Sequence, residues 1–228
     1  MNYLKEQEEN IWFTSDTHFG HNKDFVWKTR GFDSVEEMNE AIVKRWNNVI
    51  SPEDEVYHLG DFMLNNNENG LELLRQLNGH IHLIIGNHDT ETRLKLFEQE
   101  PKIVDIQYAT IIKCGKQHYF LSHYPAITAN YDDKPYHQHL INLFGHTHQL
   151  NHFYNDNPFM FNVGMDSNDC YPMNLKTIST QIHEKVNELY QEKQKSGSAA
   201  AALSEFAEAY ENAMHYFETH PLEQGILD

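Results

Sequence analysis

The sequence predicts an α/β protein, built as a four-layer sandwich of two mixed β-sheets flanked by helices, with a C-terminal helical extension. Three observations lead to this fold class. In the first half of the chain, apolar runs of strand length alternate with helical periodicity, which is the order of a largely parallel sheet. In the second half, strand-like runs follow one another with few helices between them, which indicates a second sheet packed on the first. The last part is helical, so we expect a main domain over residues 1–180 and a helical extension over residues 181–228.

The elements of the first half are marked by periodicity and by the residues at their ends. Apolar runs at residues 10–16, 55–60 and 80–86 are typical of buried strands that end in polar loops. A helix is expected over residues 34–49, because Ser34 and Glu37 fit a capping box and apolar side chains recur after it at helical spacing. Shorter helices are expected over residues 71–77 and 90–97, the first of them ended by Asn78 and Gly79.

The second half contains further strands and a helical tail. Residues 103–113 and 118–121 are predicted as the two strands of a hairpin joined by residues 114–117, and residues 140–144 and 159–163 as further strands. The pattern is helical from Leu175 onward, with a break at residues 193–198 and a second helix over residues 199–217. One face of that second helix is apolar, which suits either docking on the core or self-association. Its members are Leu203, Phe206, Tyr210, Met214 and Phe217.

Composition limits the classes of function. No apolar run is long enough to span a membrane, and the acidic N-terminus lacks the basic and apolar segments of a signal peptide, so a cytoplasmic location is expected. Cys114 and Cys170 are expected to be free thiols. The formal net charge of −17 repels nucleic acid and acidic membranes, so neither a membrane nor a sequence-specific nucleic acid is an expected partner. Phosphate substrates remain compatible, because bound divalent cations would dominate the local field.

Five segments that follow strand-like runs carry residue types that bind metals. Because the carboxyl ends of parallel strands meet at one edge of a sheet, side chains distant in sequence converge there. Carboxylate and imidazole ligands together suit manganese, iron, zinc or nickel better than calcium. A carboxylate such as Asp61 has two oxygens and can bridge two cations. Taken singly, such residues are also the capping and turn residues that commonly follow strands. The segments are Asp16-Thr17-His18, Gly60-Asp61-Phe62, Gly86-Asn87-His88-Asp89, Ser122-His123-Tyr124-Pro125 and Gly145-His146-Thr147-His148.

In this order the segments resemble the signature of the calcineurin-like metallophosphoesterases. Further likeness at Phe19-Gly20-His21 and at Asn162-Val163-Gly164-Met165-Asp166 resembles a small, stand-alone bacterial or phage branch of that superfamily. The resemblance implies hydrolysis of a phosphate ester by a hydroxide that bridges two divalent cations, of which manganese is favoured. It also implies the ligand sets: Asp16, His18, Asp61 and His148 for one cation, and Asp61, Asn87, His123 and His146 for the other.

The same resemblance assigns a catalytic role to His88, which would sit over the phosphate and stabilise the transition state or protonate the leaving oxygen. Protein serine/threonine phosphatases of this superfamily carry a second Asp and an Arg soon after the Gly-Asp motif. Here Gly60-Asp61 is followed by Phe62-Met63-Leu64-Asn65. This departure argues against phosphoprotein substrates. It also removes the carboxylate that orients the active histidine, for which Asp89 is the candidate substitute.

Two residues near the first segment have open roles. His21 either contacts the substrate or holds a metal ligand in place. Arg30 either binds a substrate phosphate with its fork of donors or forms a surface salt bridge.

The expected substrate is a small phosphate ester, either a monoester or a small diester such as a nucleotide. A nuclease is a weaker alternative, because the chain is acidic and has no basic stripe or aromatic platform. A protein of another class also stays open: a binding or assembly module that keeps the fold, with the acidic helical tail as its working surface.

Overall fold

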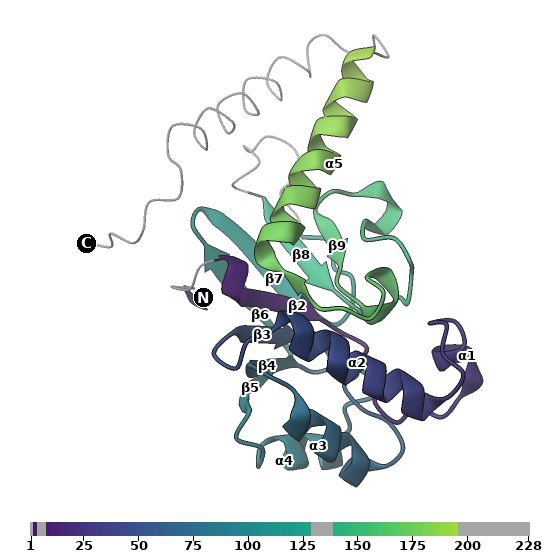
Figure 1. The fold of residues 1–228 in the computed structure, drawn as a ribbon. Coiled ribbons are helices and arrows are strands. Elements are labelled where there is room, and N and C mark those ends of the chain that lie inside the picture. Colours follow the sequence, from purple (N-terminus) through teal and green to yellow (C-terminus); the bar gives the residue numbers. More distant parts are fainter. Residues whose placement is uncertain (1, 4–7, 129–138, 196–228) are drawn as a thin grey trace.

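The structure is a computed structural model that describes residues 2–3, 8–128 and 139–195. Two five-stranded sheets pack face to face, and helices lie on the outside (Figure 1). One sheet has the strand order β10-β2-β3-β4-β5 and the other has the order β1-β6-β7-β8-β9. Both sheets are mixed, since each contains parallel and antiparallel neighbours. The predicted fold class is therefore confirmed.

The first sheet is parallel except at the edge strand β10, which runs antiparallel to β2. Its strands are β2 (Ile11–Thr14), β3 (Glu55–His58), β4 (His80–Ile84), β5 (Ile103–Gln107) and β10 (Met173–Asn174). Four helices accompany it: α1 (Asp24–Trp27), α2 (Val35–Val49), α3 (Asn67–Gln76) and α4 (Glu91–Phe97). The strand–helix alternation of the first half is thus present as predicted.

Helix α2 shows how the local sequence builds this layer. The Ser34 hydroxyl accepts a hydrogen bond from the Glu37 amide at 3.1 Å, as a capping residue does. The Glu37 carboxylate bonds the amide of Asp33 rather than that of Ser34, so the predicted capping box is displaced by one residue. Ile42 and Trp46 are fully buried on the inner face of the helix, in one core cluster with Val56 and Ile81 of the sheet.

The second sheet is built from the later part of the chain. Strands β6 and β7 form the predicted hairpin, while β8 and β9 join it in parallel. The strands are β1 (Asn2–Tyr3), β6 (Ala109–Cys114), β7 (Gln117–Ser122), β8 (Leu140–Phe144) and β9 (Met160–Asn162). Short 3₁₀ helices lie at η1 (Glu8–Asn10), η3 (Tyr154–Asp156) and η4 (Met165–Ser167).

One predicted strand is wrong. The sequence pattern predicts a single strand over residues 103–113, but this run forms β5 and β6, which belong to different sheets. The chain bends between them at Tyr108, whose side chain is 81% exposed. No glycine or proline marks this bend, so the continuous strand-like pattern conceals a crossing from one sheet to the other.

The helical tail begins with α5 (Leu175–Lys195), which starts beside β10 and β2 of the first sheet and also contacts β7 of the second (Figure 1). Ile178, Ile182 and Val186 of this helix share a core cluster with Tyr119 and Phe161 of that sheet. The helix expected over residues 199–217, with its apolar face, lies outside the described residues. Within the described ranges, no helix is long and apolar enough to cross a membrane.

Candidate metal centre

The candidate ligands follow the carboxyl ends of strands from both sheets. Asp16, Asp61 and Asn87 follow β2, β3 and β4 of the first sheet. His123 and His146 follow β7 and β8 of the second. Because the two sheets pack face to face, their carboxyl edges meet and bring together segments more than a hundred residues apart, as the contact between His18 and His148 demonstrates.

An unusual backbone conformation accompanies these ligands. A left-handed φ is uncommon for residues other than glycine and costs roughly 1–2 kcal/mol per residue. Strain of this kind gathers at functional sites, where the surrounding structure enforces it. The loops therefore hold their side chains in directions that a relaxed turn would not provide. The ligand candidates with positive φ are Asp16 (57°), His18 (48°), Asp61 (58°), His146 (66°) and His148 (49°).

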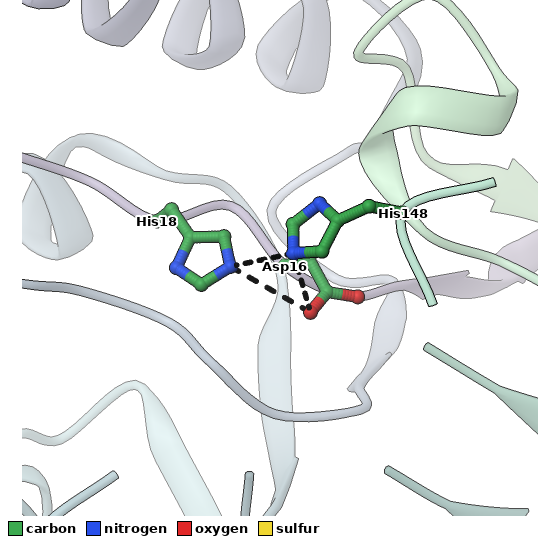
Figure 2. A group of neighbouring side chains, drawn as sticks. All are labelled: Asp16, His18 and His148. Atoms are coloured by element: carbon green, nitrogen blue, oxygen red, sulfur yellow. Dashed lines mark hydrogen bonds and ion pairs between the residues drawn. The ribbon is translucent and has the colours of Figure 1, made fainter. Parts of the chain in front are cut away.

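Three of these side chains form the first ligand cluster, made of Asp16, His18 and His148. Figure 2 shows one oxygen of Asp16 and one nitrogen from each imidazole turned toward a common point. The Nε2 atoms of His18 and His148 are 3.2 Å apart, and they lie 3.8 Å and 3.9 Å from Oδ1 of Asp16. That oxygen is buried and has no hydrogen-bond partner among the described residues. A buried, unsatisfied carboxylate oxygen facing two imidazole nitrogens is an arrangement that a cation would satisfy.

The second ligand cluster consists of Asp16, Asp61 and His123, with Asn87 beside it. Nδ1 of His123 donates to the carbonyl of Leu59 at 2.7 Å, which leaves the lone pair of Nε2 free to act as a ligand. That Nε2 faces the Asn87 side-chain oxygen at 2.9 Å and Oδ2 of Asp61 at 3.6 Å. The ring of His146 lies beside this cluster, 5.1 Å from the ring of His123 between centroids.

Burial sets the charge of the imidazoles. It lowers the pKa of His18 far below its ordinary value, and repulsion from His148 and Arg30 acts in the same direction. Burial also lowers the pKa of His146, and His123 adds to that effect. Both side chains are thus neutral at neutral pH, which is the state that binds metal.

The pKa values of Asp61 and His148 are raised rather than lowered. Burial raises the pKa of Asp61 above its usual range, since the charged form loses solvation. Burial alone would lower the pKa of His148. Its hydrogen bond to Asp166 and the charge of Asp16 outweigh this effect and raise the pKa. A cation at this place would stabilise the charged form of Asp61, which burial opposes.

Asp89 holds two backbone loops in place rather than orienting the ring of His88. Its Oδ2 accepts the amides of Asp61 and Gly86, each at 2.8 Å, and its Oδ1 accepts the amide of Phe62 at 3.2 Å. The carboxylate therefore ties the loop after β4 to the loop after β3. The sequence suggested Asp89 as the group that orients His88, but the carboxylate oxygens bond backbone amides instead.

Gly86 explains why these two loops can approach so closely. A Cβ at this position would lie 2.4 Å from the amide nitrogen of Asp61 and 2.3 Å from its Oδ1. The glycine before Asn87 is thus required by space rather than by a left-handed turn.

His88 and His21 lie at the edge of the clusters. The side chain of His88 is 45% exposed, and its Nε2 is 3.9 Å from Oδ2 of Asp61. The loop amide of the same residue donates to Oδ1 of Asp61 at 2.8 Å. His21 packs edge-on against the ring of His18, with centroids 5.5 Å apart, so it contacts a ligand candidate from outside.

Arg30 differs from both roles that the sequence suggested for it. Its side chain is only 1% exposed and pairs with Asp166 inside the protein, so Arg30 is neither in a surface ion pair nor open to a phosphate. Asp166, which the sequence marked only as part of a motif, also bonds His148. Pairing between residues 136 positions apart leaves no local sequence signal, which is why sequence reasoning missed it.

The donor set fits divalent transition cations. It combines carboxylates, imidazoles and an amide oxygen, which suit manganese, iron, zinc or nickel. Two groups of at least three donors lie with their ligand atoms within 4.8 Å of one another, which is close enough for each group to share an ion. All seven predicted metal ligands lie in or beside these two clusters: Asp16, His18, Asp61, Asn87, His123, His146 and His148.

The fold and this donor set are those of a metal-binding phosphoesterase domain. A family model for the calcineurin-like phosphoesterase superfamily domain matches residues 10–169, and the chain belongs to this family. A solved structure of a protein of unknown function from Aquifex aeolicus matches with a TM-score of 0.58 and 27% identity. That match covers 75% of this chain and 98% of the other.

Two relatives add to this comparison. An uncharacterized protein of Methanocaldococcus jannaschii is 48% identical over 81 residues, which are 35% of this chain and 46% of that protein. The Gene 66 protein of Mycobacterium phage D29 is 27% identical over 204 residues, covering 79% of this chain and 97% of the phage protein. The chain therefore matches less than half of the archaeal relative, but almost all of the phage relative.

Proposed function

We propose that this chain is a hydrolase of small phosphate esters that works with two divalent cations, manganese being favoured. The observation that carries the proposal is the position of Asp61. Its Oδ2 lies 3.8 Å from Nε2 of His18 in the first cluster and 3.6 Å from Nε2 of His123 in the second. One carboxylate oxygen between two imidazole clusters is suited to bridging a pair of ions.

The chain's own residues would divide the work as follows. Cations held by these ligands would polarise a phosphoryl oxygen and lower the pKa of a water molecule. His88, exposed at the edge of the clusters, is free to donate a hydrogen bond or a proton to the leaving oxygen. Asp89 keeps the loops of Asp61 and His88 in register through its bonds to backbone amides. This division supports acid assistance to a leaving group from the open side of the site.

The net charge and the edge of the site both support a small substrate. A net charge of −17 disfavours extended polyanions, so we favour a small monoester or diester over nucleic acid. Two exposed aromatic side chains lie against site histidines. Tyr124 contacts the ring of His146 at a centroid distance of 4.6 Å, and Phe25 contacts that of His21 at 5.5 Å. These rings offer apolar surface to the organic part of an ester.

Substitution of Asp61 by asparagine tests the proposal. Asparagine keeps the oxygen that accepts the His88 amide but removes the charge that two cations would share. We expect turnover of 4-nitrophenyl phosphate or bis(4-nitrophenyl) phosphate with manganese to fall by at least about 100-fold, more than loss of an outer partner of a ligand usually costs. Unfolding of the metal-free protein should change little, because burial already disfavours the charged form of Asp61.

Asp24→Asn is the matched control. Asp24 is 63% exposed, and among the described residues its side chain pairs with Lys28 one helical turn away, so its loss should leave turnover unchanged. If wild-type protein loaded with metal hydrolyses neither ester class, or stays fully active after exhaustive chelation, the proposal is wrong. The first of these outcomes would favour a binding module on the same fold.

A further inference from the structure

A buried ion pair lies behind the first ligand cluster. Arg30 donates from Nε to Oδ1 of Asp166 at 3.0 Å and from Nη2 to Oδ2 at 2.9 Å, which is a two-pronged contact. The side chains are 1% and 9% exposed. Removing one partner of a buried pair leaves an uncompensated charge, so the two side chains are costly to separate. Neither residue belongs to the proposed ligand set.

The remaining donors of Arg30 reach the backbone of the first ligand segment. Nη2 bonds the carbonyl of Asp16 at 2.7 Å, and Nη1 bonds the carbonyl of Thr17 at 3.2 Å. These peptide groups lie between the two left-handed residues Asp16 and His18. The guanidinium therefore holds the backbone that points both side chains at the common centre.

Asp166 completes the connection. Its Oδ2 accepts a hydrogen bond from Nδ1 of His148 at 2.8 Å. This contact orients the ring and leaves the lone pair of Nε2 directed at His18. Arg30 is thus linked to all three members of the first cluster, Asp16 and His18 through the backbone and His148 through Asp166.

The second cluster shares Asp16 with the first, but its other members are held by other groups. His123 is fixed by the carbonyl of Leu59, and Asp61 by the amide of His88. We propose that Arg30, acting with Asp166, is a positioning residue for the first cation site far more than for the second, because His18 and His148 belong to the first cluster alone. This inference rests on the proposed function, since it assumes that both clusters bind cations. Under this proposal the guanidinium donors of Arg30 hold metal ligands in place and do not bind the substrate.

The test is the number of cations bound by Arg30→Lys. Metal-free protein is titrated with Mn²⁺ by calorimetry, and electron paramagnetic resonance then reports whether bound ions are magnetically coupled as a close pair. We expect two equivalents and a coupled signal for wild type. Lysine keeps the positive charge but lacks the planar set of N–H donors that makes the two-pronged contact. The variant should therefore bind one equivalent as before and the other about 10–100-fold more weakly, with the signal of isolated ions.

Two further variants keep the inference open to disproof if Arg30→Lys folds poorly. Asp166→Asn keeps the shape but weakens the links to Arg30 and His148, and should show the same selective loss. Arg30→Ala should recover its second equivalent when free guanidinium is added. Arg75→Lys is the matched control, since Arg75 makes a similar two-pronged contact with Glu100 away from the clusters and should retain both equivalents.

The outcomes separate this inference from the proposed function. If Arg30→Lys binds two coupled ions with wild-type affinity, or loses both sites equally, Arg30 is not a positioning residue for one site. If wild-type protein itself binds no cation, the proposed function fails and the inference fails with it.

Discussion

The two sheets contribute different chemistry to one centre. The first sheet supplies the carboxylates Asp16 and Asp61 and the amide oxygen of Asn87, together called the carboxylate half. The second supplies an imidazole half, made of His123, His146 and His148. His18 is the imidazole that comes with the carboxylate half. Asp61 is held largely by its own sheet, through the amides and carboxylate of the loop after β4.

The imidazole half depends on the other sheet for its orientation. His123 donates to the carbonyl of Leu59, which follows β3, and the amide of His146 donates to Oδ2 of Asp16 at 2.8 Å. His148 is oriented by Asp166, which is fixed by Arg30 from the first half of the chain. The centre is therefore complete only when the two sheets are docked. Stability at the contact between the sheets and metal capacity should be lost together.

Gly145→Ala should break this contact and should have the largest effect on the stability of the fold. A Cβ at Gly145 would lie 2.0 Å from the Ser15 hydroxyl and 2.5 Å from Oδ2 of Asp16, which are hydrogen-bonded to each other and buried. We expect destabilisation at or above the upper end of the about 1–3 kcal/mol typical of overpacking. Thermal unfolding of the metal-free protein, together with metal content after reconstitution, measures both losses.

The control for this substitution is Gly115→Asn. Gly115 is at the β6–β7 turn with φ of 54°, a conformation that asparagine tolerates. That variant should keep its metal. A stable Gly145→Ala protein with full metal content would show that the two halves are less dependent on each other than the distances indicate.

The sequence predicted the ends of the strands better than the contacts between the halves. Asp61 and Asn87 each follow a short apolar run and a single glycine. This pattern is local, so it can be recognised in the sequence. The pairs that orient ligands are not local: Arg30 and Asp166 are 136 positions apart, and His123 and Leu59 are 64 apart. No spacing rule reports such a pair. The bend at Tyr108 was missed for a related reason, since the pattern of strand residues continues across it.

Acidification should weaken the carboxylate half through His58, which lies in the sheet beneath it. His58 is fully buried and bonds the Thr17 hydroxyl at 3.0 Å, and burial lowers its pKa to about 3. An unfolded histidine has a pKa near 6.5, so the unfolded chain binds more protons as the pH falls below that value. The stability linked to neutral His58 is complete above about pH 6.5 and is lost progressively toward pH 3.

Chemical unfolding of metal-free protein between pH 8 and pH 5 measures this effect. We expect His58 to account for a loss of about 2 kcal/mol at pH 5. His58→Phe cannot take up the proton, so its stability should fall by correspondingly less over this range. His80→Gln, at a side chain that is 53% exposed, should keep the wild-type slope. Parallel pH profiles for wild type and His58→Phe would contradict this account.

The smallest effect is expected at Tyr124, on the open side of the imidazole half. Its side chain is 51% exposed and packs against the rings of His123 and His146. If the organic part of the ester lies on this ring, Tyr124→Leu should raise KM for a phenyl ester about 2–10-fold, which corresponds to the about 0.5–1.5 kcal/mol of an aromatic contact. The kcat should hardly change, because the metal ligands stay in place.

Two comparisons make this prediction specific to the aromatic face. Tyr124→Phe keeps the ring, so its KM should remain that of wild type, and a methyl or ethyl ester should show no dependence on the ring in either variant. If the KM of alkyl and phenyl esters rises equally in Tyr124→Leu, the substitution has disturbed His123 or His146. The imidazole half would then be held in part by its own exposed surface, and not by the opposite sheet alone.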